Sequence, residues 1–226
     1  MNMTIARDKS RLAETPLFLG MSINDLDNIV ATASLGLRVY THSKPIATAG
    51  DTCLRLCLLV DGIMHVESRA HDNGYAIVET VTAPFVIQPE CLFGLTQLYT
   101  KTFTADTTCH VLAISKTEVM RLAERYDIIR LNIINILSTA AQKAQREPWR
   151  SQPRDIRAKI IRFIESRCLR PAGRKEIYIK MTRLAQETAE SRLNISRELA
   201  AMQTENLIIL RRCHITVPAL ERLIGR

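Results

Sequence analysis

The chain has 226 residues, 46% of them hydrophobic and 24% charged, with a formal net charge of +8. This composition is typical of a soluble globular protein with one large or two modest domains, and it excludes a disordered chain. No apolar run approaches the roughly 20 residues that a membrane helix needs, and residues 1–15 lack the apolar core of a secretory signal. We therefore expect a cytoplasmic protein with reduced thiols and no membrane partner.

The charge is concentrated in the C-terminal part of the chain. Residues 1–141 hold 12 basic and 14 acidic side chains, a net charge of −2, whereas residues 142–226 hold 19 and 9, a net charge of +10. Such an asymmetry suggests a polyanionic partner for the basic segment. A solvated basic surface without a partner would give the same count, so charge alone does not decide.

The N-terminal part alternates between helical and strand-like patterns. Residues 16–33 predict a helix that Ser22 caps, with Asp25 three residues later. From about 36 to 115, short β-branched runs alternate with turn signals at 48–51, 61–62 and 72–74. Strands at this spacing, joined by Asp-Gly and Asn-Gly turns, imply an antiparallel sandwich or barrel that the segment 107–115 closes.

Helical periodicity returns at residue 116 and predicts a short helix at 117–125 and a longer one from Asp127 to about 146. The apolar positions of the longer helix cover more than one face, so one face is expected to pack on its own domain and another on a partner. We predict that this partner is the same helix of a second subunit, through Ile129, Ile133, Ile136, Leu137, Ala140 and Ala144. A central helix between two domains of one chain is the alternative.

Residues 147–154 read as a hinge, because Pro148 and Pro153 interrupt the helical pattern. A helix at 155–168, a loop at 171–173 and a short strand at 177–179 are expected to follow. Two short helices then come before strands at 208–210 and 214–217, which are joined by a turn at 211–212. This hairpin would form a wing beside the helices, and Pro218 would begin a terminal helix.

The segment 182–199 carries the strongest functional signal. It reads as two amphipathic helices split by a turn, the second capped by Ser191. A recognition helix reads bases in the major groove from its first turns. The predicted DNA-contacting residues are Thr182, Ser191, Arg192, Leu193, Asn194, Ser196, Arg197, Arg211 and Arg212. In the alternative interpretation, Arg192 and Arg197 pair with Glu190 or Glu198 on a solvated face.

The order of strands, long helix, hinge and winged helix pair resembles the Crp/Fnr (cyclic-AMP receptor protein-like) family of bacterial transcription regulators, over about residues 16–226. The motif L-A-Q-E-T-A-E-S-R-L-N-I-S-R-E-L at 184–199, followed by E-N-L-I at 205–208, carries the resemblance. P-L-F-L-G-M-S at 16–22 and L-V-D-G at 59–62 resemble parts of the family's sensory domain. The resemblance implies that Arg192 and Arg197 contact a pseudo-palindromic operator in double-stranded DNA, as part of a homodimer that also meets RNA polymerase.

Two positions of the helix pair depart from the family pattern. Leu193 stands where the family often has Glu, and it can offer only an apolar contact, for instance to a thymine methyl. The base preference should therefore differ from that of the receptor protein. Ala189 stands where the family's turn usually has Gly, so the turn must form without it.

The cassette that binds cyclic nucleotides in the family departs further. The matching stretch here is V-I-Q-P-E-C-L-F at 86–93, in which Gln88 replaces a Gly, Pro89 has no N–H to donate and Glu90 is out of register. The family's Arg-Ser pair falls near Tyr99, Thr100 and Lys101, and a Lys cannot grip a phosphate bidentately. We therefore expect a pocket formed by these residues (Gln88, Glu90, Tyr99, Thr100 and Lys101) with an unknown effector other than cyclic AMP, or none.

The cysteines predict no cofactor. The family's iron–sulfur members carry a cysteine cluster near the N-terminus, and the first cysteine here is Cys53. Cys53 and Cys57 would lie about 13 Å apart on a continuous strand, so we interpret them as free thiols. The histidines show no metal or haem spacing, and no catalytic motif stands out, so we expect no enzyme activity.

The sequence thus predicts an α+β protein with three parts. These are an N-terminal antiparallel β-barrel of the cyclic-nucleotide-binding, jelly-roll kind (1–126), a dimerisation helix (127–147) and a winged helix-turn-helix domain (148–226). As a hypothesis, an effector in the barrel shifts the hinge and changes the spacing of two recognition helices, which meet half-sites roughly 34 Å apart. The alternative is a cupin-like small-molecule binding protein or enzyme with a basic tail, which would need metal ligands among His65, His71 and His110.

Overall fold

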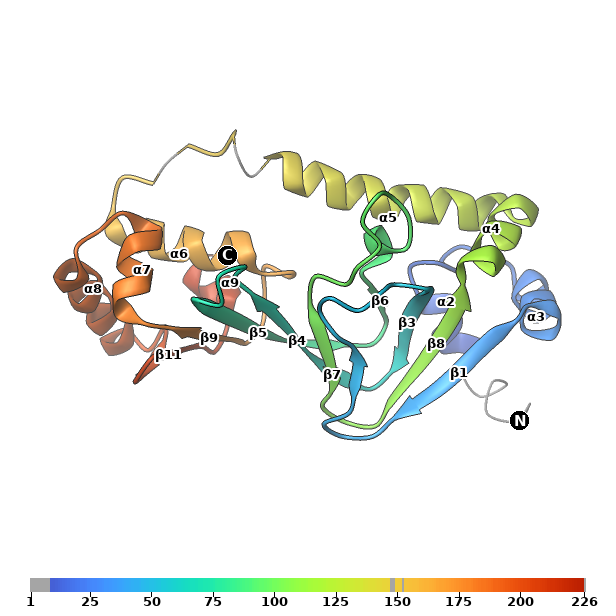
Figure 1. The fold of residues 1–226 in the computed structure, drawn as a ribbon, viewed down its shortest axis with the longest axis horizontal. Helices are drawn as coiled ribbons and strands as arrows, with labels where there is room; N and C mark the ends of the chain where they lie inside the picture. Colours follow the sequence, from blue (N-terminus) through green and yellow to red (C-terminus); the bar gives the residue numbers. More distant parts are fainter. Residues whose placement is uncertain (1–8, 147–148, 152, 226) are drawn as a thin grey trace. The chain divides into compact units, whose positions relative to one another are not determined.

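The computed structural model describes residues 9–146, 149–151 and 153–225, and the chain divides into two units (Figure 1). The first unit comprises residues 1–64 and 81–146, and the second comprises residues 65–80 and 147–226. Both units combine helices with antiparallel strands, which confirms the mixed class predicted from the sequence. The segment 65–80 was expected in the N-terminal domain and lies instead in the second unit. Glu147, Pro148 and Gln152 of the predicted hinge lie outside the described residues.

The first unit is built mainly from strands, with helices at both ends of its sequence. A four-stranded antiparallel sheet has the order β1-β8-β3-β6, and β2 pairs with β7. Among the described residues the strands pair into open sheets, and this pairing shows no closed barrel. The elements are α2 (Lys9–Glu14), α3 (Ile23–Thr32), β1 (Leu35–Tyr40), β2 (Pro45–Ala47), β3 (Arg55–Asp61), β6 (Phe85–Ile87), the 3-10 turn η1 (Pro89–Cys91), β7 (Thr102–Ala105), β8 (Cys109–Ser115), α4 (Lys116–Arg125) and α5 (Asp127–Arg146).

Local signals place α3, α4 and α5 where the sequence predicted helices, whereas α2 was not predicted. The Ser22 hydroxyl accepts the Asp25 N–H at 3.1 Å and begins α3, and the Ser115 hydroxyl accepts the Glu118 N–H and begins α4. Strand β3 lies in the middle of its sheet, where Leu58 and Leu59 are fully buried. A core residue of this size contributes roughly 1.5–3 kcal/mol by leaving water, so the apolar run of β3 determines its central position.

The second unit packs helices on one face of an antiparallel sheet. Its strands follow the order β10-β11-β9-β5-β4, and the buried apolar side chains of the helices and strands form one core around Ile160, Ile177 and Ile195. Its elements are parts of β4 (Ile63–Arg69) and β5 (Tyr75–Thr82), followed by α6 (Ile156–Arg167), β9 (Lys175–Ile179), α7 (Met181–Thr188), α8 (Arg192–Thr204), β10 (Ile209–Arg211), β11 (His214–Val217) and α9 (Leu220–Leu223).

The β4–β5 hairpin joins this unit through backbone pairing and a buried ion pair. Strand β5 pairs with β9 over five residues, from Tyr75 opposite Ile179 to Glu79 opposite Lys175. Glu79 and Lys175 are each 1% exposed, and the Lys175 ammonium donates to the Glu79 carboxylate at 2.6 Å. The same carboxylate accepts the Leu169 N–H at 2.7 Å. Because a buried charge needs such partners, the hairpin is an integral part of the second unit.

Candidate nucleic-acid interface

The helix pair forms at the predicted residues, and its turn is made by an unusual alanine. Ala189 ends α7 in the left-handed conformation, with φ +53°, and its N–H reaches the carbonyls of Ala185 and Gln186. Glycine is the usual residue in this conformation because it has no Cβ. The turn expected to form without glycine is therefore made by a strained alanine. The Ser191 hydroxyl then accepts the Asn194 N–H at 3.1 Å and begins α8, as predicted.

Helix α8 presents the predicted contact residues to solvent. Its buried side chains are Ile195, Leu199 and Met202, which face the core of the second unit. Asn194 is half-buried, and the other predicted contacts of the helix are exposed, namely Ser191, Arg192, Leu193, Ser196 and Arg197. The 3.6-residue period thus separates a core face from a face that carries two arginines.

The acidic residues beside these arginines are neutralised from helix α6. Arg157 binds Glu198 through Nε at 2.6 Å, and it binds both oxygens of Glu205 at 2.5 and 2.8 Å. Lys159 of the same helix binds Glu190 at 2.5 Å. The Lys159 ammonium holds the pKa of Glu190 below its usual range, and Arg157 does the same for the pKa of Glu205.

The alternative predicted from the sequence, in which Arg192 and Arg197 pair with Glu190 or Glu198, is therefore wrong. Both carboxylates have their partners on α6. Within the part of the chain that the structure describes, neither arginine makes an ion pair or a side-chain hydrogen bond. The two guanidinium groups are exposed and available for an anionic partner.

A groove collects further cations beside the start of α8. It has a volume of about 400 Å³ and lies between the start of α7, the start of α8 and the β10–β11 turn. Thr182, Arg192, Arg211 and Arg212, all predicted contacts, line it together with Lys180. The structure thus brings together predicted residues that are up to 30 positions apart in the sequence. Asn194, Ser196 and Arg197 do not line this groove and belong to the open face of α8.

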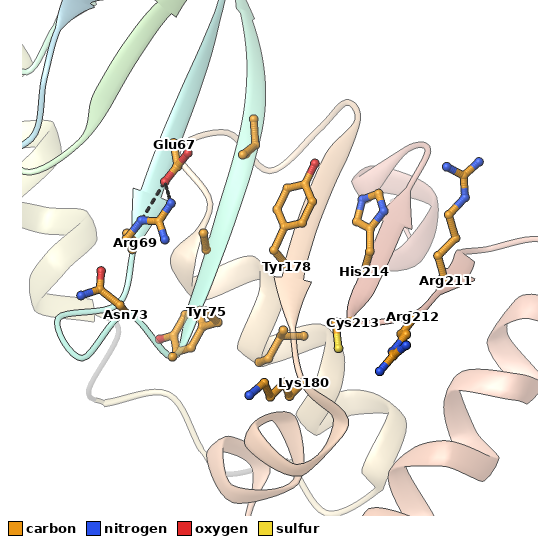
Figure 2. A pocket seen from close by; sticks show the side chains of 14 residues that line it. Glu67, Arg69, Asn73, Tyr75, Tyr178, Lys180, Arg211, Arg212, Cys213 and His214 are labelled. Carbon is orange, nitrogen blue, oxygen red and sulfur yellow. Dashed lines mark hydrogen bonds and ion pairs between the residues drawn. The ribbon is translucent and has the colours of Figure 1, made fainter.

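Lys180 was missed by the sequence analysis. It is the residue immediately before α7, it is exposed, and its ammonium has no partner among the described residues (Figure 2). The signal that could have identified it is its position, since a basic residue at the start of the first helix lies on the same side as the start of the second. Short-range patterns do not reveal this proximity, because it depends on how the two helices cross.

Solved structures of other proteins resemble this chain over most of its length. CprK in complex with OCPA matches with a TM-score of 0.51 and 15% identity, over 88% of this chain and 94% of that chain. A cysteine-to-serine variant of CprK in complex with OCPA matches with a TM-score of 0.51 and 16% identity, over 90% and 93%. Catabolite Activator Protein of Thermus thermophilus matches with a TM-score of 0.49 and 19% identity, over 93% and 97%. The chain has the fold of CprK. No protein-family model and no curated protein matches the sequence.

Within the first unit, the predicted effector residues lie together around Gln88. Gln88 is 5% exposed, and its amide oxygen accepts the N–H groups of Thr100 at 3.0 Å and Lys101 at 3.1 Å. Its amide nitrogen donates to the Thr100 hydroxyl at 2.7 Å and to Glu90 at 3.3 Å. Tyr99 is buried and donates to the Arg55 carbonyl, and burial raises the pKa of its hydroxyl. The structure brings all five residues together, but Gln88 bonds to Glu90, Thr100 and Lys101, and Tyr99 bonds to Arg55.

The expected separation of Cys53 and Cys57 is wrong. Both sulfurs approach the Arg55 carbonyl oxygen, at 3.6 and 3.9 Å. The reason is that β3 begins at Arg55, so Cys53 precedes the strand and does not lie on it. Both thiols are free, as predicted, and burial raises the pKa of Cys57. Among the described residues, no three His, Cys, Asp or Glu side chains form a group that could hold a metal ion.

The predicted dimer residues of α5 divide between two environments. Ile129 is 1% exposed, and Ile133 and Ile136 line a small apolar pocket of their own unit. Leu137 is half-buried, and Ala140 and Ala144 are exposed. The large apolar side chains that α5 leaves in solvent are Leu131 and Ile134, which are 52% and 51% exposed and were not in the predicted set. No helix in the described part of the chain is long and apolar enough to cross a membrane.

Proposed function

We propose that this protein is a homodimeric, sequence-specific DNA-binding transcription regulator that reads the major groove with α8. The observation that supports this most strongly is the charge arrangement around that helix. Arg192 and Arg197 are exposed without ionic partners among the described residues, while helix α6 neutralises the neighbouring carboxylates. An arginine in this state can take O6 and N7 of guanine bidentately.

The remaining cations would hold the DNA backbone. Lys180, Arg211 and Arg212 line the groove beside α8 and suit phosphate oxygens, which carry no sequence information but fix the register of the protein. Leu193 lies between the two arginines in the sequence and is 59% exposed, so it would meet an apolar group such as a thymine methyl. Specificity would therefore come from α8 and affinity from the groove.

The second copy would pack on α5. Leu131 and Ile134 lie close to one turn apart on the helix, and both are exposed. Two such helices in a dimer would bury these side chains and set the distance between two copies of α8. Ile133 and Ile136 would instead hold α5 on its own unit. Contact with RNA polymerase stays a prediction.

We further infer that cyclic AMP is not the effector. The cluster around Gln88 already satisfies the backbone N–H groups of Thr100 and Lys101, and Pro89 has none to offer. Calorimetric titration of the full chain with cyclic AMP, up to about 1 mM, should give no binding heat. A binding free energy as weak as about −5 kcal/mol would still be detected at that concentration. Saturable binding of cyclic AMP to the unchanged chain would contradict this inference.

The experiment that tests the DNA proposal uses the full chain and duplexes selected by it from a random pool. Arg197→Ala should weaken binding to the selected duplex by about 1–3 kcal/mol and should relax the preference at one base pair. Arg222→Ala is the matched control, since it changes one arginine of the same unit away from α8. Arg212→Ala should weaken binding to all duplexes alike and reduce the salt slope by about one. Failure to enrich any sequence, or equal effects of Arg197→Ala and Arg222→Ala, would refute the proposal.

A further inference from the structure

The outer face of the second unit's sheet carries one cross-strand row of side chains with a gap in it. The Ala70 N–H donates to the Tyr75 carbonyl, which places Arg69 of β4 opposite Ala76 of β5. Ala76 pairs with Tyr178 of β9, and Tyr178 pairs with His214 of β11. The row therefore reads Arg69, Ala76, Tyr178, His214 across four adjacent strands. Every member except Ala76 has a planar group.

Tyr178 and His214 already form a stack. Their ring centroids are 4.6 Å apart, and the ring planes differ by only 2°. His214 is fixed in this position by a hydrogen bond to Glu176, which also accepts from Thr216 at 2.7 Å. On the other side of Tyr178 the neighbour in the row is Ala76, whose methyl group is too small to cover the Tyr178 ring. Tyr178 remains 48% exposed.

The spacing of the strands leaves room for one ring between Tyr178 and Arg69. Neighbouring strands lie about 4.8 Å apart, so β4 and β9 are separated by about 9.5 Å, with β5 between them. A planar ring stacked on both sides needs two intervals of about 3.5–4.0 Å. Figure 2 shows the Arg69–Glu67 pair on one side of this hollow and Tyr178 on the other. The hollow has a volume of about 900 Å³, and Ala76 lies buried at its floor.

Polar groups at the rim of the hollow indicate which substituents a ring bound between Tyr178 and Arg69 would carry. Lys180 lines the hollow, follows β9 directly and has no partner among the described residues. Arg69 binds Oε1 of Glu67, and Oε2 has no donor in the described part of the chain. An anionic substituent would meet the ammonium, and an exocyclic N–H or O–H group would meet this carboxylate oxygen.

We propose that this hollow is a binding site for a planar aromatic anion that stacks between Tyr178 and Arg69. In the protein without DNA, the ring fills the place above Ala76, its anionic group binds Lys180, and its amino or hydroxyl group donates to Glu67. Two sources share this chemistry, a mononucleotide with an exocyclic amino group and a simple aromatic acid. The site lies on the second unit and uses none of the residues of the Gln88 cluster.

Calorimetric titration of the full chain without DNA tests the proposal with two probes, adenosine 5′-monophosphate and 4-aminobenzoate. At least one should bind saturably. Adenosine and ribose 5-phosphate control for the nucleotide, and aniline and benzoate control for the acid. Each control lacks either the anion, the ring or the amino group, and each should bind at least tenfold more weakly than its parent compound. The parent compound that binds identifies the source.

Three variants then locate the binding. Tyr178→Ala removes one wall, and Ala76→Leu fills the gap, so each should weaken binding at least tenfold. Tyr178→Phe keeps the stacking face and should retain binding. Thr80→Leu places a leucine on the same face of β5, two rows away, and this variant should bind as the unchanged chain does. Circular dichroism and thermal unfolding verify that each variant is folded. The proposal is overturned if neither probe binds, or if folded Tyr178→Ala and Ala76→Leu proteins bind as the unchanged chain does.

Discussion

The buried pair of Glu79 and Lys175 predicts a large and specific loss of stability when one partner is removed. Both side chains are 1% exposed, and they join β5 of the hairpin to β9. Glu79→Leu would leave the Lys175 ammonium buried without a counter-charge, at a cost of about 3–5 kcal/mol. It would also deprive the Leu169 N–H of its acceptor, which adds about 1–3 kcal/mol. We expect a total of about 4–8 kcal/mol.

The reverse change and the double change should cost less. In Lys175→Met, the Glu79 carboxylate keeps the N–H groups of Leu169 and Arg170, so the loss should be about 3 kcal/mol, at the lower end for a broken buried pair. In the double variant no charge is buried, and the lost hydrogen bond between the Leu169 N–H and Glu79 accounts for about 1–3 kcal/mol. The double variant should therefore be more stable than Glu79→Leu alone, which is a non-additivity of about 4 kcal/mol or more.

Differential scanning calorimetry of the full chain measures this cycle. For a unit of roughly 100 residues, 1 kcal/mol shifts the midpoint by about 4–8 °C, so Glu79→Leu should lower the second unit's transition by about 15 °C or more. The transition of the first unit is the internal control. Additive effects of the two changes, or a loss below about 1 kcal/mol for Glu79→Leu, would show that the hairpin is not part of the second unit and would refute this reasoning.

Three further changes probe local features. Ala189→Gly should stabilise the second unit by about 0.5–1 kcal/mol in urea unfolding. The change removes a Cβ from a residue in the left-handed conformation, at some cost in chain entropy. A loss of stability would show that Ala189 is not strained. Burial raises the pKa of Glu176, but hydrogen bonds from Thr216, Arg174 and His214 outweigh it and hold this pKa below its usual range. The stabilisation is thus present at neutral pH and is lost as the pH falls from about 4.3 through the folded pKa. Thr216→Val removes one of the hydrogen bonds, so it should raise the pKa of Glu176 in an NMR titration and move acid unfolding to higher pH. Gly62→Ala should destabilise the first unit by about 3 kcal/mol in thermal unfolding, since its Cβ would meet the Thr108 carbonyl oxygen at 2.5 Å at a φ of +104°; an unchanged midpoint would contradict this.

The features that the sequence predicted correctly are those encoded by neighbouring residues. Ser22 and Ser191 each cap the helix predicted to follow them, and the apolar period of α8 separates its core face from its exposed arginines. These signals depend on hydrogen bonds and side-chain spacings within one turn of the chain. The fold class and the helix pair followed from them.

The features that the sequence did not reveal depend on contacts between distant residues. Glu198 was a candidate partner for Arg197, but it binds Arg157, which lies 41 positions earlier. The apolar residues of α5 could not be divided between core and solvent until the strands beneath the helix were placed. The pairing of β5 with β9 joins residues about 100 positions apart, and no local pattern of either strand specifies its neighbour.

The pairing of β5 with β9 changes which segments of the chain can couple the two units. The sequence placed the coupling between the two parts of the chain in the linker at 147–154. The structure adds a second covalent route, because β4 and β5 both cross the boundary between the two units, at 64–65 and at 80–81. The hairpin also contacts the first helix of the α7–α8 pair, since Arg183 of α7 binds Asp72 at 2.9 Å. Arg167 links Tyr75 of the hairpin to Glu187 of α7, at 2.7 and 2.8 Å.

A reorientation of the second unit therefore cannot use the linker alone. It must carry the hairpin along, or it must break five registered residue pairs and a buried ion pair. The second alternative is unfavourable, since breaking the ion pair by itself costs about 3–5 kcal/mol, as much as or more than a typical allosteric coupling of about 1–3 kcal/mol. We therefore expect the β4–β5 hairpin and α8 to move as one body in any such reorientation.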